Sequence, residues 1–528
     1  MQLSPTIQKN DVKIFVILTI MMFVIFLFTA DGHRHSPDED FGHEQAKRIY
    51  EQKPHPDYVQ DKSNYGFDYP SLKSPWTQPI CYNGVLCSSI PIGYSITFIP
   101  FIALNDFFNF VSSDTVTWTL DDFPNPHYVL WRNGLPVNFV FIELAYGPLF
   151  ASFTVGVFYY LCRVMNYQQK TSIFMGLLLG LSTILWPYSQ TSLNVIPATF
   201  FTLLGFFFFV KFTKEHNSRN ILFCGVSIGF AYLVRMDAML FIFPIILFLI
   251  YNLKNKNSKL KSIFAYLIPI MSSFLIQKTI DYIRFGSSYV TETINVVGTK
   301  TDTSQIPNLL GHNYPLFIGG FGLLLSPGLG LLIFAPIFFL IFLSFPDFYK
   351  NHKQECILIL IIVSLFLVFF GTSFRWHGLI GWSARYILVI VPLLLLPLGA
   401  TLEKRNPKFI IPIILSLGGI GAFFNLTYLS QDVIFFIWGE PGVSGLFVVD
   451  KIDNIRNDLN LDPSTLWSFK YSQLTHSILS VFNGTSVDIF LMKVLGETIY
   501  YVSFISIVSF LSVIMIKTFK GISKSQLV

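Results

Sequence analysis

The stretch Ile14–Ala30, IFVILTIMMFVIFLFTA, contains no charged residue and decides the class of fold. About 20 apolar residues in a helix cross the hydrocarbon core of a bilayer. Runs of this kind recur along the 528 residues, of which 52% are hydrophobic and only 13% are charged. That balance excludes a soluble globular domain. The sequence therefore predicts an all-α polytopic integral membrane protein, and the absence of a small-residue cleavage site before Asp31 predicts an uncleaved signal anchor.

Hydropathy predicts about twelve transmembrane helices. Their alternation puts most lysine and arginine clusters on one side, which the positive-inside rule makes cytoplasmic. Most acidic residues fall on the other side, so we expect a multi-pass plasma-membrane protein with its active surface on the exoplasmic face. The spans lie near 14–30, 136–162, 171–188, 191–210, 220–236, 238–253, 262–282, 316–345, 356–373, 386–402, 409–430 and 497–516.

The apolar stretch Ser88–Phe110 affects this topology, because it is long enough to add a span. It contains two prolines and Asp106. These residues favour a helix at the membrane interface or a re-entrant element over a further crossing.

The five cysteines agree with the predicted orientation. Cys162, Cys224 and Cys356 fall in or beside predicted helices, where a free thiol behaves as a small apolar group. Cys81 and Cys87 lie close together in the first external segment. An oxidising compartment permits a disulfide between them, and a pair of free thiols is the alternative.

A helix start follows the first span. Ser36 is a good N-cap, Pro37 suits the first helical position, and Glu39 stands three residues after the serine, as in a capping box. A capped helix lying at the membrane surface is therefore the plain structural interpretation.

Capping does not explain why two further acids flank Glu39. A carboxylate held at a helix N-terminus stays ionised and oriented, and can accept a proton from a hydroxyl group. We therefore take Asp38, Glu39 and Asp40 as candidate catalytic residues. No cofactor is expected to be required, but a divalent cation bound by Asp38, Asp40 and His43 is an open alternative.

A second group of candidates lies in the stretch 371–386, GTSFRWHGLIGWSARY, a predicted external loop. An arginine fork suits phosphate oxygens, and Trp376 and Trp382 suit the headgroup level of a bilayer. The loop is predicted to hold an anionic lipid headgroup, unless its arginines only snorkel to lipid phosphates or pair with external acids. The candidate phosphate-binding residues are Arg375, His377 and Arg385.

Two other arginines stand at predicted outer helix ends. Arg284 is a further candidate for the donor phosphate, although pairing with Asp281 explains it equally well. Arg235 and Asp237 are close enough in sequence to neutralise each other. In addition, the glycines and prolines of 319–336 predict a broken segment at membrane depth, which forms a cavity wall or a packing kink.

These stretches, in order, resemble the GT-C superfamily of membrane glycosyltransferases, and more closely its dolichyl-phosphate-mannose-protein mannosyltransferase and RgtA/B/C/D-like branch. The resemblance covers most of the chain. WPYS in this branch is often followed by a glutamate where this chain has Asn194, and the absence of a WWDYG-like motif argues against an oligosaccharyltransferase. The landmarks are SPDEDFGHEQAKRIYE, IPIGYSITFIPF, LWPYSQTSLNVIP, RFGSSYVTE, GLLLSPGLGLLIFAPIFF and GWSARYILVIVPLL.

The resemblance implies a three-part organisation and an activity. Residues 1–430 would form the GT-C-like module, including the external loop 31–135; 431–496 would form an external loop; and 497–528 the last helix and a cytoplasmic tail. By this resemblance the acidic pair Asp38 and Glu39 supplies the catalytic carboxylate, and Arg385 contacts the donor phosphate.

The implied reaction transfers a sugar from a polyprenyl-phosphate donor to a hydroxyl of a protein, lipid or glycan acceptor, with inversion, as in protein glycosylation or cell-envelope assembly. Apart from these partners and membrane lipids none is expected, and nothing indicates nucleic acid. The competing class is a polytopic transporter or flippase for a solute or lipid-linked sugar. Few ionisable residues occur within the predicted spans, Glu143 being one, and this argues against a transport path.

Overall fold

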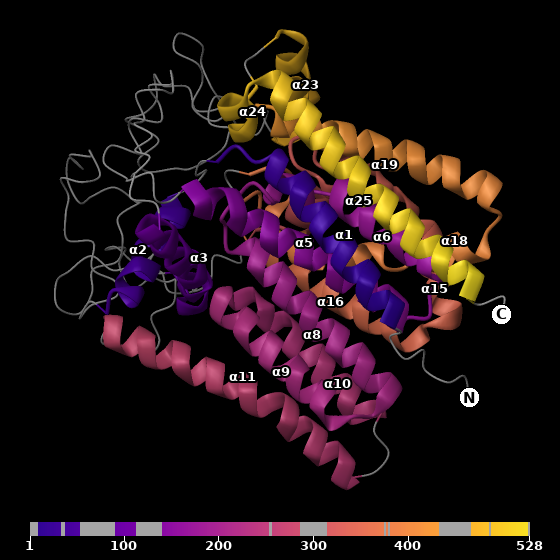
Figure 1. The fold of residues 1–528 in the computed structure, drawn as a ribbon. Helices are drawn as coiled ribbons and strands as arrows, with labels where there is room; N and C mark the ends of the chain where they lie inside the picture. Colours follow the sequence, from indigo (N-terminus) through magenta and orange to yellow (C-terminus); the bar gives the residue numbers. More distant parts are fainter. Residues whose placement is uncertain are drawn as a thin grey trace.

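The computed structural model describes residues 9–32, 37–52, 90–111, 140–252, 256–285, 314–373, 376–378, 381–431, 466–484 and 487–525. Every regular element in these ranges is an α-helix or a 3-10 helix (Figure 1). The predicted all-α polytopic class is therefore confirmed.

The elements follow the order of the predicted spans. The first half contains α1 (Lys9–Phe28), α2 (Pro37–Tyr50), α3 (Ile92–Val111), α5 (Val140–Val164), α6 (Gln169–Ser182), α7 (Leu185–Tyr188), α8 (Val195–Glu215), α9 (Ser218–Val234), η3 (Met236–Phe241), α10 (Ile242–Asn252) and α11 (Lys256–Phe285). The second half contains α13 (Leu316–Leu325), α14 (Leu331–Phe334), η5 (Pro336–Leu340), α15 (Ile341–Asn351), α16 (Lys353–Gly371), η6 (Arg385–Ile390), α17 (Val391–Leu395), α18 (Leu398–Lys404), α19 (Pro407–Leu429), η8 (Phe469–Tyr471), α23 (Gln473–Phe482), α24 (Phe490–Leu495) and α25 (Glu497–Ser525).

The predicted number of twelve spans is not confirmed by helix length. Among the described residues, eight helices are long and apolar enough to cross a membrane, and several shorter apolar helices accompany them. Each predicted span nevertheless coincides with helical structure. The difference arises because several spans are interrupted, so that one crossing is built from consecutive short helices.

The helices pack in chain order at the centre of the molecule. α5 packs against α1 and α8, α9 packs between α8 and α11, and α25 lies along α1 (Figure 1). The hydroxyl of Tyr500 on α25 donates a hydrogen bond to the carbonyl of Phe28 over 2.8 Å. Helix α25 is thereby fastened to the C-terminal end of α1.

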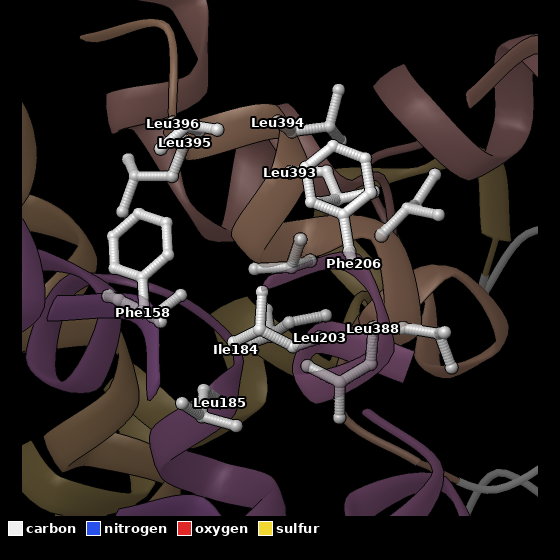
Figure 2. Packing of buried hydrophobic residues seen from close by; sticks show 14 of the residues in the cluster. Phe158, Ile184, Leu185, Leu203, Phe206, Leu388, Leu393, Leu394, Leu395 and Leu396 are labelled. Atoms are coloured by element: carbon white, nitrogen blue, oxygen red, sulfur yellow. The ribbon is translucent and has the colours of Figure 1, made fainter. Parts of the chain in front are cut away.

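The core joins the two halves of the chain. Side chains of α5, α7 and α8 interlock with those of η6 and α17 (Figure 2). In a bilayer such packing supplies dispersion energy, since lipid tails are as apolar as leucine. The labelled members, all buried, are Phe158, Ile184, Leu185, Leu203, Phe206, Leu388, Leu393, Leu394, Leu395 and Leu396.

The segment predicted near 316–345 is broken, as its glycines and prolines indicate. The helix stops at Leu325, and the freed backbone is bound by other parts of the protein. The carbonyl of Leu466 accepts from the amide of Gly328 over 3.0 Å and from the Ser326 hydroxyl. The carbonyl of Leu329 accepts from the Ser383 hydroxyl over 3.0 Å. These bonds replace the helical ones, so irregular backbone is tolerated at this depth.

Two further sequence predictions concern buried and external residues. Cys162, Cys224 and Cys356 are buried free thiols, as expected. Cys81 and Cys87 lie outside the described residues, so their disulfide stays a prediction.

A glycine on α5 sets how closely the helix can approach the turn after α7. A β-carbon at Gly147 would overlap the carbonyl oxygens of Ser189 and Thr191, which are backbone atoms and cannot swing aside. Gly419, on α19, has nothing within 4 Å of the same position and offers a matched control.

We expect Gly147→Ala to destabilise the protein by about 1–3 kcal/mol, because overpacking forces a backbone shift. Gly419→Ala should be neutral or stabilising by up to about 1 kcal/mol, because alanine has the higher helix propensity. Thermal unfolding of the two detergent-purified variants, monitored by size-exclusion chromatography, measures both changes in stability. Equal melting temperatures for the two variants would contradict the close approach.

Candidate functional site

The residues between α7 and α8 form a buried turn, called here the 188–194 turn. Residues 188 to 193 are all buried, although most of them are polar. Part of the backbone is satisfied locally, since the amide of Thr191 donates to the carbonyl of Tyr188 over 3.0 Å. Buried polar backbone that is not paired locally needs other partners, and each missing one costs free energy.

The end of α1 supplies one set of partners. Gln190 donates through Nε2 to the carbonyl of Thr29 over 2.7 Å and to that of Leu429 over 3.3 Å. The indole of Trp186 donates to the Thr29 hydroxyl over 3.0 Å. The turn is therefore tied to the C-terminal ends of both α1 and α19.

The side chains of α2 and α3 hold the other face of the turn. Glu39 accepts a hydrogen bond from the Ser192 amide through Oε1 over 2.9 Å, and the hydroxyl of Tyr94 donates to the Ser192 carbonyl over 2.7 Å. Glu39 is 0% exposed. Its predicted capping box with Ser36 stays a prediction, because Ser36 lies outside the described residues, and one oxygen of Glu39 binds Ser192. It thus positions α2 on the turn.

The remaining contacts of α2 explain its orientation. His43 is buried with its ring edge-on to Phe98 at 4.1 Å, and the Ser95 hydroxyl donates to Gln45. A β-carbon at Gly42 would lie 2.5 Å from the Tyr94 ring, so α2 and α3 are in close contact. These contacts fix one face of α2 as the packed face.

Asp38 and Asp40 belong to α2, but their side chains lie outside what the structure describes. Consecutive helical positions are about 100° apart around the axis. Positions 38 and 40 are therefore on either side of the direction taken by buried Glu39.

Two arginines meet on the other side of the 188–194 turn. The guanidinium carbon of Arg385 lies 5.2 Å from the centre of the Tyr386 ring, and that of Arg235 lies 5.4 Å from it. Arg235 donates through Nε to Asp237 over 2.8 Å, so the predicted pairing of these two residues is present. Both terminal nitrogens of Arg235 remain without a hydrogen bond to the described residues.

Tyr188 faces these arginines from the turn itself. The positive charges of Arg385 and Arg235 both act on its buried hydroxyl, which has no hydrogen-bond partner among the described residues. A β-carbon at Gly381 would lie 2.6 Å from that hydroxyl and 3.2 Å from Cδ of Arg385. The lack of a side chain at Gly381 allows the tyrosine and the arginine to approach each other.

The 188–194 turn therefore contacts both predicted groups at different residues. Ser192 contacts Glu39 of the acidic helix start, and Tyr188, four residues earlier, lies beside Arg385. A buried hydroxyl next to two guanidinium groups is a set of donors suited to phosphate oxygens.

Arg284 has a different environment. It is buried on α11 and donates through Nη1 to the carbonyl of Ile90 over 2.9 Å, where the chain enters α3. The expected alternative, pairing with Asp281, is not what the described contacts show, because Asp281 binds Lys278 over 3.1 Å and Gln277 over 2.8 Å. No contact of the described residues joins Arg284 to Arg385.

The stretch 371–386 differs from the prediction at its tryptophans. Trp376 and Trp382 are buried within the protein and not exposed to lipid headgroups, while their depth in the membrane stays a prediction. Trp382 packs on Phe334 at 4.6 Å and on Tyr428 at 4.5 Å between ring centres. The physical reason is the broken segment 316–345, which offers aromatic surfaces that hydropathy does not reveal.

Of the other two candidate phosphate-binding residues of this stretch, the structure describes His377 but not Arg375. His377 is half-buried beside Trp376, with ring centres 5.8 Å apart. Arg375 lies outside the described residues.

Metal binding stays a prediction. Among the described side chains, no group of three or more histidine, cysteine, aspartate or glutamate residues could hold a metal ion. The proposed set includes Asp38 and Asp40, whose side chains are not described.

Sequence reasoning missed Tyr188 and the position of Arg235 beside Arg385. WPYS was noted as a landmark and Arg235 as half of an ion pair, but residues 150 apart carry no local signal that they face each other. A buried tyrosine in a polar turn before a membrane helix was the available clue.

Comparison with known proteins bears on the same region. Residues 145–278 match the sequence model of a family described as dolichyl-phosphate-mannose-protein mannosyltransferase. This segment runs from α5 into α11 and contains both the 188–194 turn and Arg235. No curated protein matches the chain.

Among solved structures, the chain is similar to ArnT from Cupriavidus metallidurans in the apo state, with 12% identity and a TM-score of 0.44 over 81% of this chain and 65% of that one. It is also similar to the apo oligosaccharyltransferase of Archaeoglobus fulgidus, with 11% identity and a TM-score of 0.48 over 86% of this chain and 60% of that one. This chain thus spans less than two thirds of either protein. The family resemblance expected from the sequence is confirmed over residues 145–278, where the chain is similar to the dolichyl-phosphate-mannose-protein mannosyltransferases.

Proposed function

We propose that the protein is an integral-membrane glycosyltransferase that moves a sugar from a polyprenyl-phosphate donor to an acceptor hydroxyl at the exoplasmic face. One observation carries the proposal: the 188–194 turn, inside the segment that matches the mannosyltransferase family, contacts the acidic helix α2 through Ser192 and lies beside Arg385 and Arg235 through Tyr188. A base and a phosphate clamp at one site are what this transfer needs.

The arginines and the tyrosine form the phosphate clamp in this proposal. The donor phosphate gains negative charge as the bond to the sugar breaks, and fixed donors around it stabilise that charge most strongly in a site that excludes water. Arg385 and Arg235 supply the positive charge, while the Tyr188 hydroxyl, which has no hydrogen-bond partner among the described residues, donates a hydrogen bond to the phosphate. Arg375 and His377 stay candidates for the rim of the same site, whereas Arg284 acts as a tether between α11 and α3.

Asp38 is the proposed general base. The Ser192 amide occupies one oxygen of Glu39, which is fully buried, so Glu39 serves as a positioning residue. The Asp38 carboxylate takes the proton from the acceptor hydroxyl as its oxygen bonds to the anomeric carbon. The bond from that carbon to the phosphate oxygen breaks, and the polyprenyl phosphate leaves with the electron pair. A single displacement of this kind inverts the anomeric configuration.

Neither a metal nor another cofactor is required by this scheme, because a phosphate leaving group needs little protonation. The acceptor is a hydroxyl of a protein, lipid or glycan. Transfer that vanishes with chelator and returns with added Mg²⁺ or Mn²⁺ would instead support the alternative set of Asp38, Asp40 and His43.

Substitutions of the two adjacent acids, Asp38 and Glu39, are predicted to affect activity and stability differently. Asp38→Asn should lower transfer from labelled polyprenyl-phosphate sugars by about 100-fold or more, because the base is lost, and should leave the melting temperature unchanged. Glu39→Gln should lose less activity, since an amide oxygen can still accept from Ser192. Glu39→Ala should lose about 1–3 kcal/mol of stability, because the Ser192 amide is left buried and unpaired.

Transfer assays and thermal unfolding on the same preparations measure these differences. Full activity of Asp38→Asn would remove this carboxylate from the mechanism. Solute uptake into proteoliposomes without any sugar transfer would favour the transporter class.

Tyr188→Phe is predicted to weaken binding of the donor without lowering the stability of the protein. The hydroxyl has no hydrogen-bond partner among the described residues, so its removal should leave stability unchanged or raise it slightly, whereas the KM for the donor should rise about 10-fold with the loss of one hydrogen bond to a charged phosphate. Tyr266→Phe is the matched control, because the Tyr266 hydroxyl on α11 is also buried and unpaired among the described residues.

Donor titrations at saturating acceptor give the KM, and unfolding in the absence of donor gives the stability. A KM that rises equally in both variants, or in neither, would exclude Tyr188 from the phosphate site.

A further inference from the structure

A second charged cluster lies at the ends of α15 and α18. The carboxylate of Asp347 is buried and accepts from Lys404 Nζ over 2.5 Å and from Arg405 Nε over 2.6 Å. The hydroxyl of Thr401 lies 3.4 Å from the same carboxylate. The two cationic side chains are each 42% exposed, so their outer faces remain open.

A third cation joins them. Lys350 lies three residues after Asp347 on α15, and contact with the ammonium group of Lys404 lowers the pKa of Lys350 from its ordinary value. The two ammonium groups carry like charges and repel each other. Among the described residues, Asp347 is the acidic group that acts on Lys350 and Lys404, so the cluster of three cations and one carboxylate keeps an excess of two positive charges.

The acidic residues near the cluster in the sequence, Glu403 and Glu355, bind other groups. The carboxylate of Glu403 accepts from the Gln168 amide before α6, and that of Glu355 binds Lys214 over 3.2 Å. The excess charge is therefore not neutralised by these two residues.

Exposed aromatic side chains occur on α15, which carries Asp347, and at the start of α19, which follows Arg405 in the chain. Phe342 is 77% exposed and Tyr349 is 42% exposed; they are seven residues apart on α15 and so share one face of it. Phe409, at the start of α19, is 73% exposed. In a membrane protein such side chains face lipid, which puts the cluster at the boundary between hydrocarbon and water.

The cluster is remote from the proposed active site. Arg385 begins and Lys404 ends one membrane-length segment, which consists of η6, α17 and α18. At 1.5 Å per helical residue the two ends are about 30 Å apart, so they lie at opposite membrane faces. Since the positive-inside rule puts Lys404 in the cytoplasm, this cluster meets the leaflet opposite the donor.

We propose that Lys350, Lys404 and Arg405 form a binding site for the phosphate of an anionic phospholipid in the cytoplasmic leaflet. The charge excess favours an anion, and the exposed aromatic side chains of α15 and α19 favour one that carries acyl chains over free phosphate. This site is independent of the proposed transfer reaction.

Native mass spectrometry of the full chain, titrated with phosphatidylglycerol, phosphatidylcholine or inorganic phosphate, tests the proposal. Phosphatidylglycerol should stay bound at activation energies that remove phosphatidylcholine. In the double variant Lys350→Gln/Lys404→Gln, its affinity should fall about 30-fold, from the loss of two cations at the membrane surface.

The matched control is Lys259→Gln/Lys261→Gln, which removes the same charge from the basic end of α11 and should keep the affinity. Lys404→Arg, which retains the charge, should bind as the wild type does and shows that folding is intact. Equal loss in the two double variants would overturn the site, because it would reflect net charge alone. Equal affinity for inorganic phosphate would overturn its assignment to a lipid.

Discussion

The structure depends on how one polar turn is accommodated inside a membrane bundle. Both backbone polar groups of Ser192 are bound by side chains, the amide by Glu39 on α2 and the carbonyl by Tyr94 on α3. An unpaired group buried at this depth would cost about 1–3 kcal/mol, so the turn can exist only where α2 and α3 are docked. The helix that carries the acidic cluster is consequently placed by the backbone of the segment before α8.

The same turn shows how the buried candidate site can be polar and still be stable. Gln190 and Trp186 satisfy their donors on the ends of α1 and α19, and Gly147 lets α5 approach the turn closely. Against this paired background, the Tyr188 hydroxyl stands out because it has no partner among the described residues and lies beside two guanidinium groups. Fully paired neighbours make the turn rigid, and rigidity is what an electrostatic clamp requires. The cluster around Asp347 at the far end of the bundle shows the opposite arrangement, with exposed cations around a buried acid.

Interrupted helices allow the bundle to place polar groups at the candidate site. The freed backbone at Ser326–Gly330 is bound by Leu466 and Ser383, and the resulting irregular wall buries Trp382 between Phe334 and Tyr428. The 3-10 helix η6 then starts at Arg385, so the arginine stands where this wall meets the next helical segment. Breaks in regular structure thus occur where polar residues must reach the site, and the surrounding protein makes them affordable in a membrane.

Composition and hydropathy were sufficient for the membrane class, for the helical ranges and for the helix beginning at Pro37, because these follow from local periodicity and capping chemistry. The order of short stretches was also enough to recognise the family over 145–278. What the sequence could not decide is which distant residues meet: Glu39 binds the Ser192 amide, Arg284 binds the carbonyl of Ile90, and the two tryptophans of 371–386 are buried in the protein. Arg235 and Arg385 approach one ring from helices 150 residues apart, and only the tertiary structure decides that, because the contact depends on how the helices pack and not on any local preference of the chain.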